Sequence, residues 1–302
     1  MLTGRSIPIR YALGKVKHEL IRMMAFSLAL HAINFFFRGS LPQIPMALPI
    51  LLGTSITLLL AFNINHSYDR WWEARKVWGA IVNDSRSLVL QVTCFVVDRD
   101  ERARAVVLER VALRQIAFCH SLGQSLRGRP PITPAQARLL SSEDLRFTLA
   151  QTNQPLGVLM CHQMELRALS ARRQINCLQQ IQIDATLVRL CEAMGRAERI
   201  KNTVFPVTYR LFTHYFIYLF LIFLSIALIE TVAAYEAPIL VLLTSTYFLL
   251  EKTALHMQDP FDNRPTDTSV TAIAQAIEIN LRQLIGDDAP PPPAPPPGFY
   301  VM

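Results

Sequence analysis

The chain has 302 residues, of which 51% are hydrophobic and 18% charged, and its formal net charge is +7. This composition is too apolar for an ordinary soluble domain and too charged for a protein that lies wholly in lipid. We therefore expect its mass to be divided between bilayer and water. An excess of Lys and Arg suits nucleic acid, an anionic membrane face or an anion pathway, so the placement of the charges has to decide.

Four apolar runs predict four transmembrane helices: residues 23–37, 47–62, 211–229 and 237–250. Only the third run approaches the ~20 residues that a lone span needs. The others are short or carry polar residues, which helices tolerate when they face a protein interior or water. We expect no charge deep within a span apart from His31 and His214. The pattern predicts a multi-pass helix bundle.

The basic residues predict the orientation of the chain. Five precede the first run, twenty lie in residues 63–206, and residues 231–236 have none. By the positive-inside tendency both termini and the long middle segment are cytoplasmic. The absence of a cleavage site predicts that the first run is a retained membrane helix. The odd number of cysteines predicts reduced thiols in the cytoplasm, with all five in the middle segment: Cys94, Cys119, Cys161, Cys177 and Cys191.

The middle segment has helical periodicity almost throughout, with breaks predicted at 127–134 and 153–155, where Pro and Gly occur. A capped helix start is predicted at 142–145, and an amphipathic helix over 271–285. The predicted regions are an N-terminal helix with transmembrane helices 1 and 2 (1–62), a cytoplasmic helical region (63–206), transmembrane helices 3 and 4 (207–252), a cytoplasmic C-terminal helix (253–286) and a Pro-rich tail (287–302).

Residues 67–87 place charges and tryptophans together directly after the second apolar run. On a continuing helix Asp69 and Glu73 share a face, as do Trp71 and Arg75. A membrane-interface belt with ion pairs between helices explains this pattern, and a binding role is the alternative.

The same segment resembles the signature of the bacterial bestrophins, carried here by Tyr68, Asp69, Arg70, Trp71, Trp72, Glu73, Arg75 and Trp78. Three further matches follow in order: residues 198–200 with Pro206, residues 211–214, and Asp259-Pro260-Phe261. The resemblance covers nearly the whole chain except the Pro-rich tail. It implies an all-α membrane protein with four transmembrane helices, a large cytoplasmic helical region and a homopentameric assembly around one central pore.

The resemblance also implies where the pore narrows. Counting back from Asn63 places a neck near Ala47, Leu51 and Ser55, and counting back from Ala197 places a cytoplasmic aperture at Leu178. The residues themselves agree, because Ala47, Leu51, Ser55, Leu58 and Phe62 form one helical stripe that suits a pore gated by dewetting. Ordinary packing between helices through small residues is the other explanation of this stripe.

Ion preference and calcium dependence follow less directly. The relatives in animals bind calcium through acidic residues after the Pro-Phe turn; here residues 259–267 are interrupted by Arg264, which predicts a calcium-independent channel. Similarity to the bacterial branch favours monovalent cations slightly, and an anion (chloride) channel is the alternative. We expect a bacterial cytoplasmic (inner) membrane protein.

Other chemistry is not supported by the sequence. No zinc spacing, phosphate loop or nucleophile motif occurs, so we expect no enzyme activity, no metal and no cofactor. Dispersed charges argue against nucleic-acid binding. A secondary transporter and a non-conducting membrane scaffold remain as alternatives. The tail ends in aromatic residues, and Phe299 and Tyr300 either dock on their own or a neighbouring subunit or belong to a disordered tail.

Overall fold

The computed structural model describes residues 9–37, 42–203, 206–232, 235–262, 264, 266–287 and 291–292. All regular structure in these ranges is helical. Four of the described helices are long and apolar enough to cross a membrane. The predicted all-α membrane protein with four transmembrane helices is thereby confirmed. Phe299 and Tyr300, which carry the prediction about the tail, lie outside the described residues.

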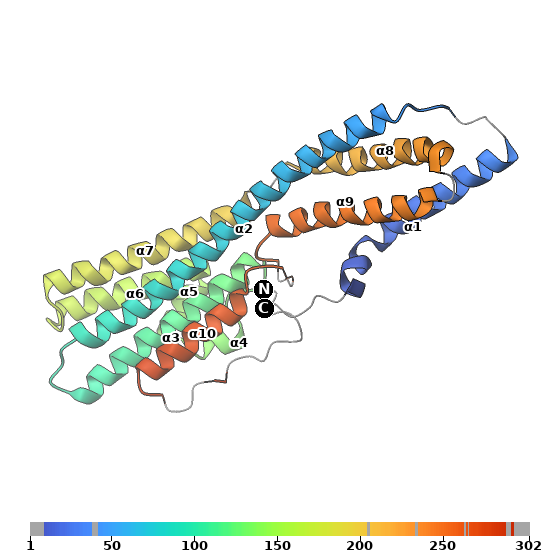
Figure 1. Cartoon of the computed structure of the whole chain (residues 1–302). Helices are drawn as coiled ribbons and strands as arrows, with labels where there is room; N and C mark the ends of the chain where they lie inside the picture. Colours follow the sequence, from blue (N-terminus) through green and yellow to red (C-terminus); the bar gives the residue numbers. More distant parts are fainter. Residues whose placement is uncertain are drawn as a thin grey trace. The chain divides into compact units, whose positions relative to one another are not determined.

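Ten helices follow one another along the described chain (Figure 1): α1 (Ile9–Phe36), α2 (Ala47–Phe95), α3 (Glu101–Leu126), α4 (Pro134–Ala137), α5 (Ser142–Leu149), α6 (Gln154–Ala171), α7 (Cys177–Asn202), α8 (Val207–Val232), α9 (Glu236–Gln258) and α10 (Val270–Leu284). The candidate spans are α1, α2, α8 and α9. With 49 residues, α2 is about 74 Å long at 1.5 Å per residue, more than twice the ~30 Å of a hydrocarbon core.

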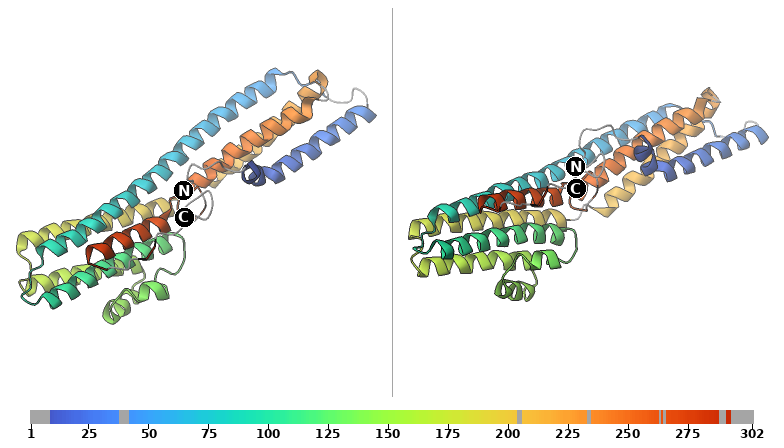
Figure 2. Two further views of the ribbon diagram at one scale, coloured as in Figure 1. Left: turned by 60° about the horizontal axis from the view of Figure 1, so that its bottom comes forward. Right: turned by 90° about the horizontal axis from the view of Figure 1, so that it is seen from below.

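The chain forms two compact units. The membrane unit comprises the described residues of 4–70 and 204–258, and the polar unit comprises those of 71–203 and 259–302. In the membrane unit α9 packs against both α1 and α8, and these helices run side by side in both figures (Figures 1 and 2). The core of the membrane unit is formed by apolar side chains from α1, α2, α8 and α9, among them Val16, Ile56, Ile217 and Phe248.

In the polar unit α3 packs against α6 and α10, and α6 against α7 (Figure 2). Its core includes Trp78 and Phe118, both fully buried. Buried charges are paired here: the Arg114 guanidinium lies 2.8 Å from Asp144 and 3.4 Å from Glu165. A buried guanidinium that kept only one of these partners would lose much of the compensation for its desolvation.

Helix ends occur at the predicted breaks because the residues there cap or interrupt helices. After Leu126, Gly128 adopts a positive φ of 66°, a conformation that glycine reaches without strain. Asn153 caps α6 by accepting the amide of Leu156. The predicted start at 142–145 is α5, whose cap is Ser141 and whose first turn carries two acidic residues. The predicted amphipathic helix is α10.

Candidate functional site

The predicted neck residues form an exposed stripe on α2. Ala47, Leu51, Ser55, Leu58 and Phe62 are all exposed within the chain, and the three large ones expose 64%, 59% and 54% of their surface. The spacing of three and four residues puts the five side chains on one helix face. This apolar face has no cover within the described part of the chain, although it belongs to a helix whose other side is packed.

The packed side of α2 determines which residues are left in the stripe. Ile56 and Leu60 are buried against the membrane unit's core. On the same packed side, Gly53 lies so close to α8 that an added Cβ would stand 2.9 Å from the Phe220 ring. The close contact made possible by this glycine therefore fixes the rotation of α2 about its own axis.

Hydroxyl side chains in this part of α2 are satisfied without leaving the helix. Ser55 donates to the carbonyl of Leu51 at 2.9 Å, and Thr54 donates to that of Ile50 at 2.8 Å. Such bonds to the preceding turn let an apolar environment accept the hydroxyl groups. Ser55 therefore adds little exposed polarity to the stripe, which is mostly apolar in character.

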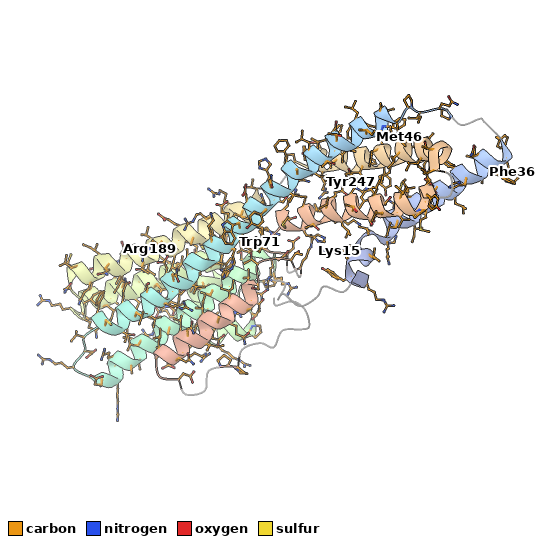
Figure 3. The ribbon with its side chains drawn as sticks, viewed as in Figure 1. Lys15, Phe36, Met46, Trp71, Arg189 and Tyr247 are labelled. Carbon is orange, nitrogen blue, oxygen red and sulfur yellow. The ribbon has the colours of Figure 1, made fainter. Side chains whose placement is uncertain are left out.

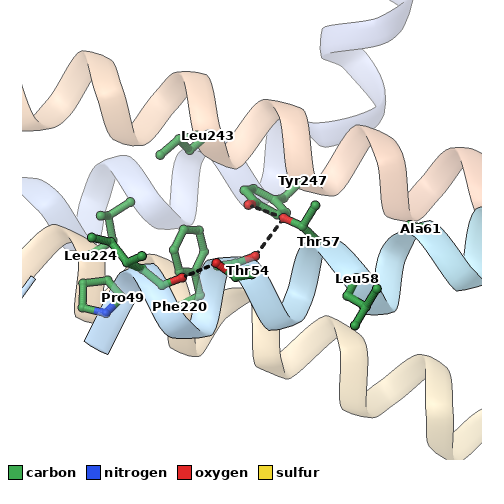
Figure 4. A pocket seen from close by; sticks show the side chains of 11 residues that line it. Pro49, Thr54, Thr57, Leu58, Ala61, Phe220, Leu224, Leu243 and Tyr247 are labelled. Atoms are coloured by element: carbon green, nitrogen blue, oxygen red, sulfur yellow. Dashed lines mark hydrogen bonds between the residues drawn. The ribbon is translucent and has the colours of Figure 1, made fainter. Parts of the chain in front are cut away.

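A groove of about 610 Å³ lies beside the stripe, between α2, α8 and α9 (Figure 4). Thr57 and Tyr247 meet across it with their hydroxyl oxygens 3.0 Å apart. Phe220, Leu224 and Leu243 make the rest of its surface largely apolar. Its chemistry suits a hydrocarbon chain or an apolar side chain better than an ion.

A buried polar cluster follows the stripe. Asn63 is 4% exposed, and its Oδ1 accepts a hydrogen bond of 2.9 Å from Nε2 of Gln258 at the end of α9. Arg70 donates from Nε to the Gln258 carbonyl at 2.6 Å. The sequence pattern did not identify Gln258; its only signal is that it follows the fourth apolar run. The cluster ties α2 to α9 where the membrane unit ends.

The signature residues have several different environments. Trp78 is a fully buried core residue of the polar unit, and Trp71 donates from its ring to the carbonyl of Thr266 at 3.1 Å. Trp72 is nearly half exposed and stacks on Trp71. Glu73 pairs with Arg199 of α7 at 2.6 Å. Arg70, Glu73 and Trp78 of the signature therefore hold helices together.

The remaining signature residues lie nearer to solvent. Tyr68 and Asp69 are exposed, whereas Arg75 is half-buried. Asp69 continues the exposed face of α2 one turn beyond His66. It is the first carboxylate on that face after the neutral stripe.

Leu178, the predicted aperture residue, stands in the first turn of α7 and exposes 78% of its surface. A capping box fixes the turn: the Asn176 side chain accepts from the Gln179 amide, and the Gln179 side chain accepts from the Asn176 amide, both at 2.9 Å. A large apolar side chain is thus held away from the core of the polar unit on a well-defined backbone.

The prediction that only His31 and His214 are ionisable groups deep in the spans is wrong. Glu236, fully buried at the start of α9, accepts hydrogen bonds from Ser27 at 2.5 Å and from Ser225, and lies 3.3 Å from His31. Glu251, also buried, pairs with His214 at 3.0 Å. Glu251 was missed because α9 continues past the apolar run that ends at residue 250.

Two carboxylates of the segment after α9 have defined partners. Asp262 lies 2.8 Å from Lys201 and 3.2 Å from Arg264. Asp267 is buried and accepts the amide of Arg264, and burial raises its pKa to about 6. No group of three or more His, Cys, Asp or Glu side chains able to hold a metal occurs among the described residues.

Three comparisons relate the chain to known proteins. A family model described as bacterial/fungal bestrophin protein matches residues 11–283. The voltage-dependent anion channel-forming protein YneE of Escherichia coli O157:H7 is 31% identical over 90% of this chain and 87% of its own length. The voltage-dependent anion channel-forming protein mll4386 of Mesorhizobium japonicum is also 31% identical, over 80% of this chain and 75% of its own.

Solved structures agree with the sequence comparisons. A point mutant of a bacterial bestrophin homologue from Klebsiella pneumoniae is 25% identical, with a TM-score of 0.83 over 90% of this chain and 99% of that chain. Another structure of a bacterial bestrophin homologue from Klebsiella pneumoniae gives a TM-score of 0.81 at 24% identity, over 92% of this chain and 99% of that chain.

Proposed function

Because the chain belongs to the bacterial and fungal bestrophin family, we propose that it forms a homopentameric channel that conducts monovalent ions passively through a pore lined by α2. The exposed stripe from Ala47 to Phe62 carries this proposal. Burial in lipid satisfies such a face no less than burial against another helix does, so its lack of a cover within the chain leaves it available to line a pore shared by several copies. A narrow apolar ring of this kind passes ions when wet and blocks them when dry.

Leu178 is proposed as the second constriction. Its exposure and its capped backbone support a fixed apolar ring formed by one leucine from each copy. Leu178→Ala widens such a ring, so we expect a higher single-channel conductance or a changed ion preference. Leu156→Ala on α6, which removes a similarly sized exposed side chain from the polar unit, is the matched control and leaves the current unchanged. Equal currents in wild type and Leu178→Ala would remove Leu178 from the pore.

Passive conduction fits the membrane unit better than transport does. Secondary transporters use discontinuous helices at the midplane. Within the described residues α1, α2, α8 and α9 are each unbroken. The buried carboxylates Glu236 and Glu251 are engaged by serine and histidine side chains of neighbouring helices, which suits a structural role.

Calcium independence is part of the proposal. The Asp262 carboxylate is occupied by Lys201 and Arg264, and these cations oppose the approach of a divalent ion. Chelation of calcium is therefore expected to leave the current unchanged.

Two ion preferences have support. The exposed face of α2 is neutral along the stripe and then reaches Asp69, which favours monovalent cations. The relatives named as anion channel-forming proteins favour chloride as the second candidate.

The reversal potential across a planar bilayer tests the function and decides between these ions. Purified protein is placed under a NaCl gradient, and chloride is then replaced by a bulky anion. A reversal near the sodium potential supports cation conduction, and one near the chloride potential supports anion conduction. Silence at every voltage, also in Leu178→Ala, would contradict the channel and favour a membrane scaffold.

The same proposal includes the location of the chain in the cytoplasmic membrane with both termini inside. We also propose that the regions of the chain end at residues 62, 206, 252 and 286. Phe299 and Tyr300 are proposed to dock on their own or a neighbouring subunit. Gln275 donates to the carbonyl of Pro292 at 2.8 Å, which holds the start of the tail against α10. A variant that lacks residues 293–302 is expected to conduct ions like the wild type. If the truncated variant instead loses a protein that co-purifies with the wild type, the scaffold is favoured.

A further inference from the structure

A second groove, of about 590 Å³, lies in the membrane unit between α1 and α9. Met24 and Leu28 form its wall on α1, and Pro238 and Val241 form its wall on α9. Met24 and Leu28 expose more than half of their surface. Both helices are candidate membrane spans, so the groove opens on the bilayer and is filled by hydrocarbon or by another apolar group.

The α1 wall continues toward the N-terminus into basic side chains. Arg10 and Lys17 are exposed and precede Met24 by fourteen and seven residues, a spacing that returns to one face of a regular helix. At 1.5 Å per residue Lys17 is about 10 Å along the helix from Met24 and about 16 Å from Leu28. This spacing is close to the ~15 Å that one leaflet contributes to the hydrocarbon core.

The α9 wall also reaches basic side chains at the same end. Lys252 and His256 follow Pro238 and Val241 on one face of α9. His256 lies 2.9 Å from Nζ of Lys15, and Lys252 donates to the Lys15 carbonyl. Figure 3 shows Lys15 near the start of α1 and Phe36 at its far end, so the basic groups gather at one end of the helix pair.

One carboxylate faces this cluster. Glu19 is buried and lies 2.8 Å from Lys252, so that pair is neutral overall. Arg10 and Lys17 then give a positive charge to the part of α1 that precedes the groove, with Lys15 beside them. A basic cluster at the end of an apolar membrane groove is complementary to a negatively charged headgroup attached to an acyl chain.

We propose that this groove is a binding site for an anionic phospholipid. The phosphate binds at Arg10 and Lys17, and one acyl chain lies along Met24 and Leu28 toward His31. The proposal does not depend on ion conduction. A free phosphate would need only the basic cluster, whereas the lipid also needs the groove, and this difference separates the two ligands.

Native mass spectrometry of the detergent-solubilised protein tests the proposal with phosphatidylglycerol and phosphatidylcholine of equal chain length. Each basic residue near a membrane surface contributes about 1 kcal/mol to anionic lipid binding. Arg10→Gln with Lys17→Gln is therefore expected to weaken phosphatidylglycerol binding about thirtyfold, to the level of phosphatidylcholine. The matched control is Arg138→Gln with Arg167→Gln, which removes two exposed charges from the polar unit and leaves binding unchanged.

A second variant tests the groove itself. Ala25 lines the groove and is exposed, so Ala25→Trp fills the space while it keeps an apolar surface and both basic residues. We expect the variant to lose phosphatidylglycerol and to keep the oligomeric mass of the wild type. The proposal would be overturned if wild type bound the two lipids equally, or if phosphatidylglycerol binding were unchanged both in Arg10→Gln with Lys17→Gln and in Ala25→Trp. If only Ala25→Trp kept phosphatidylglycerol, the proposed site would be reduced to a surface attraction for anions.

Discussion

Gly53 offers a direct test of the packing that orients α2. It lies on the side of α2 that meets α8, and a Cβ placed there would stand 2.9 Å from Cε2 and 3.3 Å from Cζ of Phe220. Phe220 is buried and rests edge-on against the Tyr247 ring, with the two centroids 5.3 Å apart. Phe220 also lines the groove between α2, α8 and α9, so Gly53→Ala either pushes its ring off the Tyr247 contact toward that groove or moves α2 away from α8.

The expected stability change is the difference between two effects. An alanine in a helix interior is favoured over glycine by about 1 kcal/mol. Overpacking costs typically about 1–3 kcal/mol, and a Cβ this close to an aromatic ring that is packed against Tyr247 belongs to the upper half of that range. Gly53→Ala is therefore expected to destabilise the protein by about 1–2 kcal/mol. Gly195→Ala on α7 meets nothing within 4 Å and is expected to stabilise the protein by about 1 kcal/mol.

Thermal unfolding in detergent and single-channel recording measure the two consequences. The unfolding midpoint is expected to fall in Gly53→Ala, to rise in Gly195→Ala, and to recover in Gly53→Ala with Phe220→Leu, which removes the obstructing ring. Because the exposed stripe lies on another face of the same helix, we also expect a changed conductance in Gly53→Ala alone. A raised midpoint with unchanged conductance in Gly53→Ala would refute the reasoning.

Two further predictions concern the polar unit. Burial raises the pKa of Asp267 to about 6 from an ordinary 3.8. The stability that its neutral carboxyl group contributes is therefore present below pH 3.8 and is lost as the pH rises through 6. Unfolding midpoints measured across this range are expected to fall less in Asp267→Asn than in wild type, and identical pH profiles of the two midpoints would contradict this. A thiosulfonate reagent is expected to modify the exposed Cys177 and to change the current, and Cys177→Ser is the control. Cys119 and Cys161 are buried, and burial raises their thiol pKa values to about 12 and about 11. Mass spectrometry is therefore expected to find these two cysteines unmodified.

The sequence predicted the fold class and the family because both depend on features that are local in the chain. Four apolar runs mark the spans, and the segment from Tyr68 to Trp78 carries the resemblance that the family match confirms. The chain is a bestrophin-family ion channel, and the prediction that it is not an enzyme agrees with this membership. Helix breaks such as Gly128 and Asn153 were predictable for the same reason, since caps act within a few residues.

Features that depend on contacts between distant segments could not be predicted in this way. The partner of Asn63 is Gln258, and nothing in the local pattern links the two. The buried carboxylate of Glu236 lies at the start of α9 and looked like a loop residue. Its serine partners come from α1 and α8, so only the packed bundle shows why a charge is tolerated there. The neck and aperture residues stay predictions.

The cap that holds Leu178 also bears on how this chain can change. The two hydrogen bonds between Asn176 and Gln179 involve residues on either side of position 178 and make no use of its side chain. Natural selection or an engineer can therefore exchange the side chain at 178 for a larger, smaller or polar one while the backbone beneath it stays in place. With Leu178 in its proposed role at the aperture, a single codon is enough to change permeation in a descendant of such a chain, without the compensating substitutions that a change in the packed core demands.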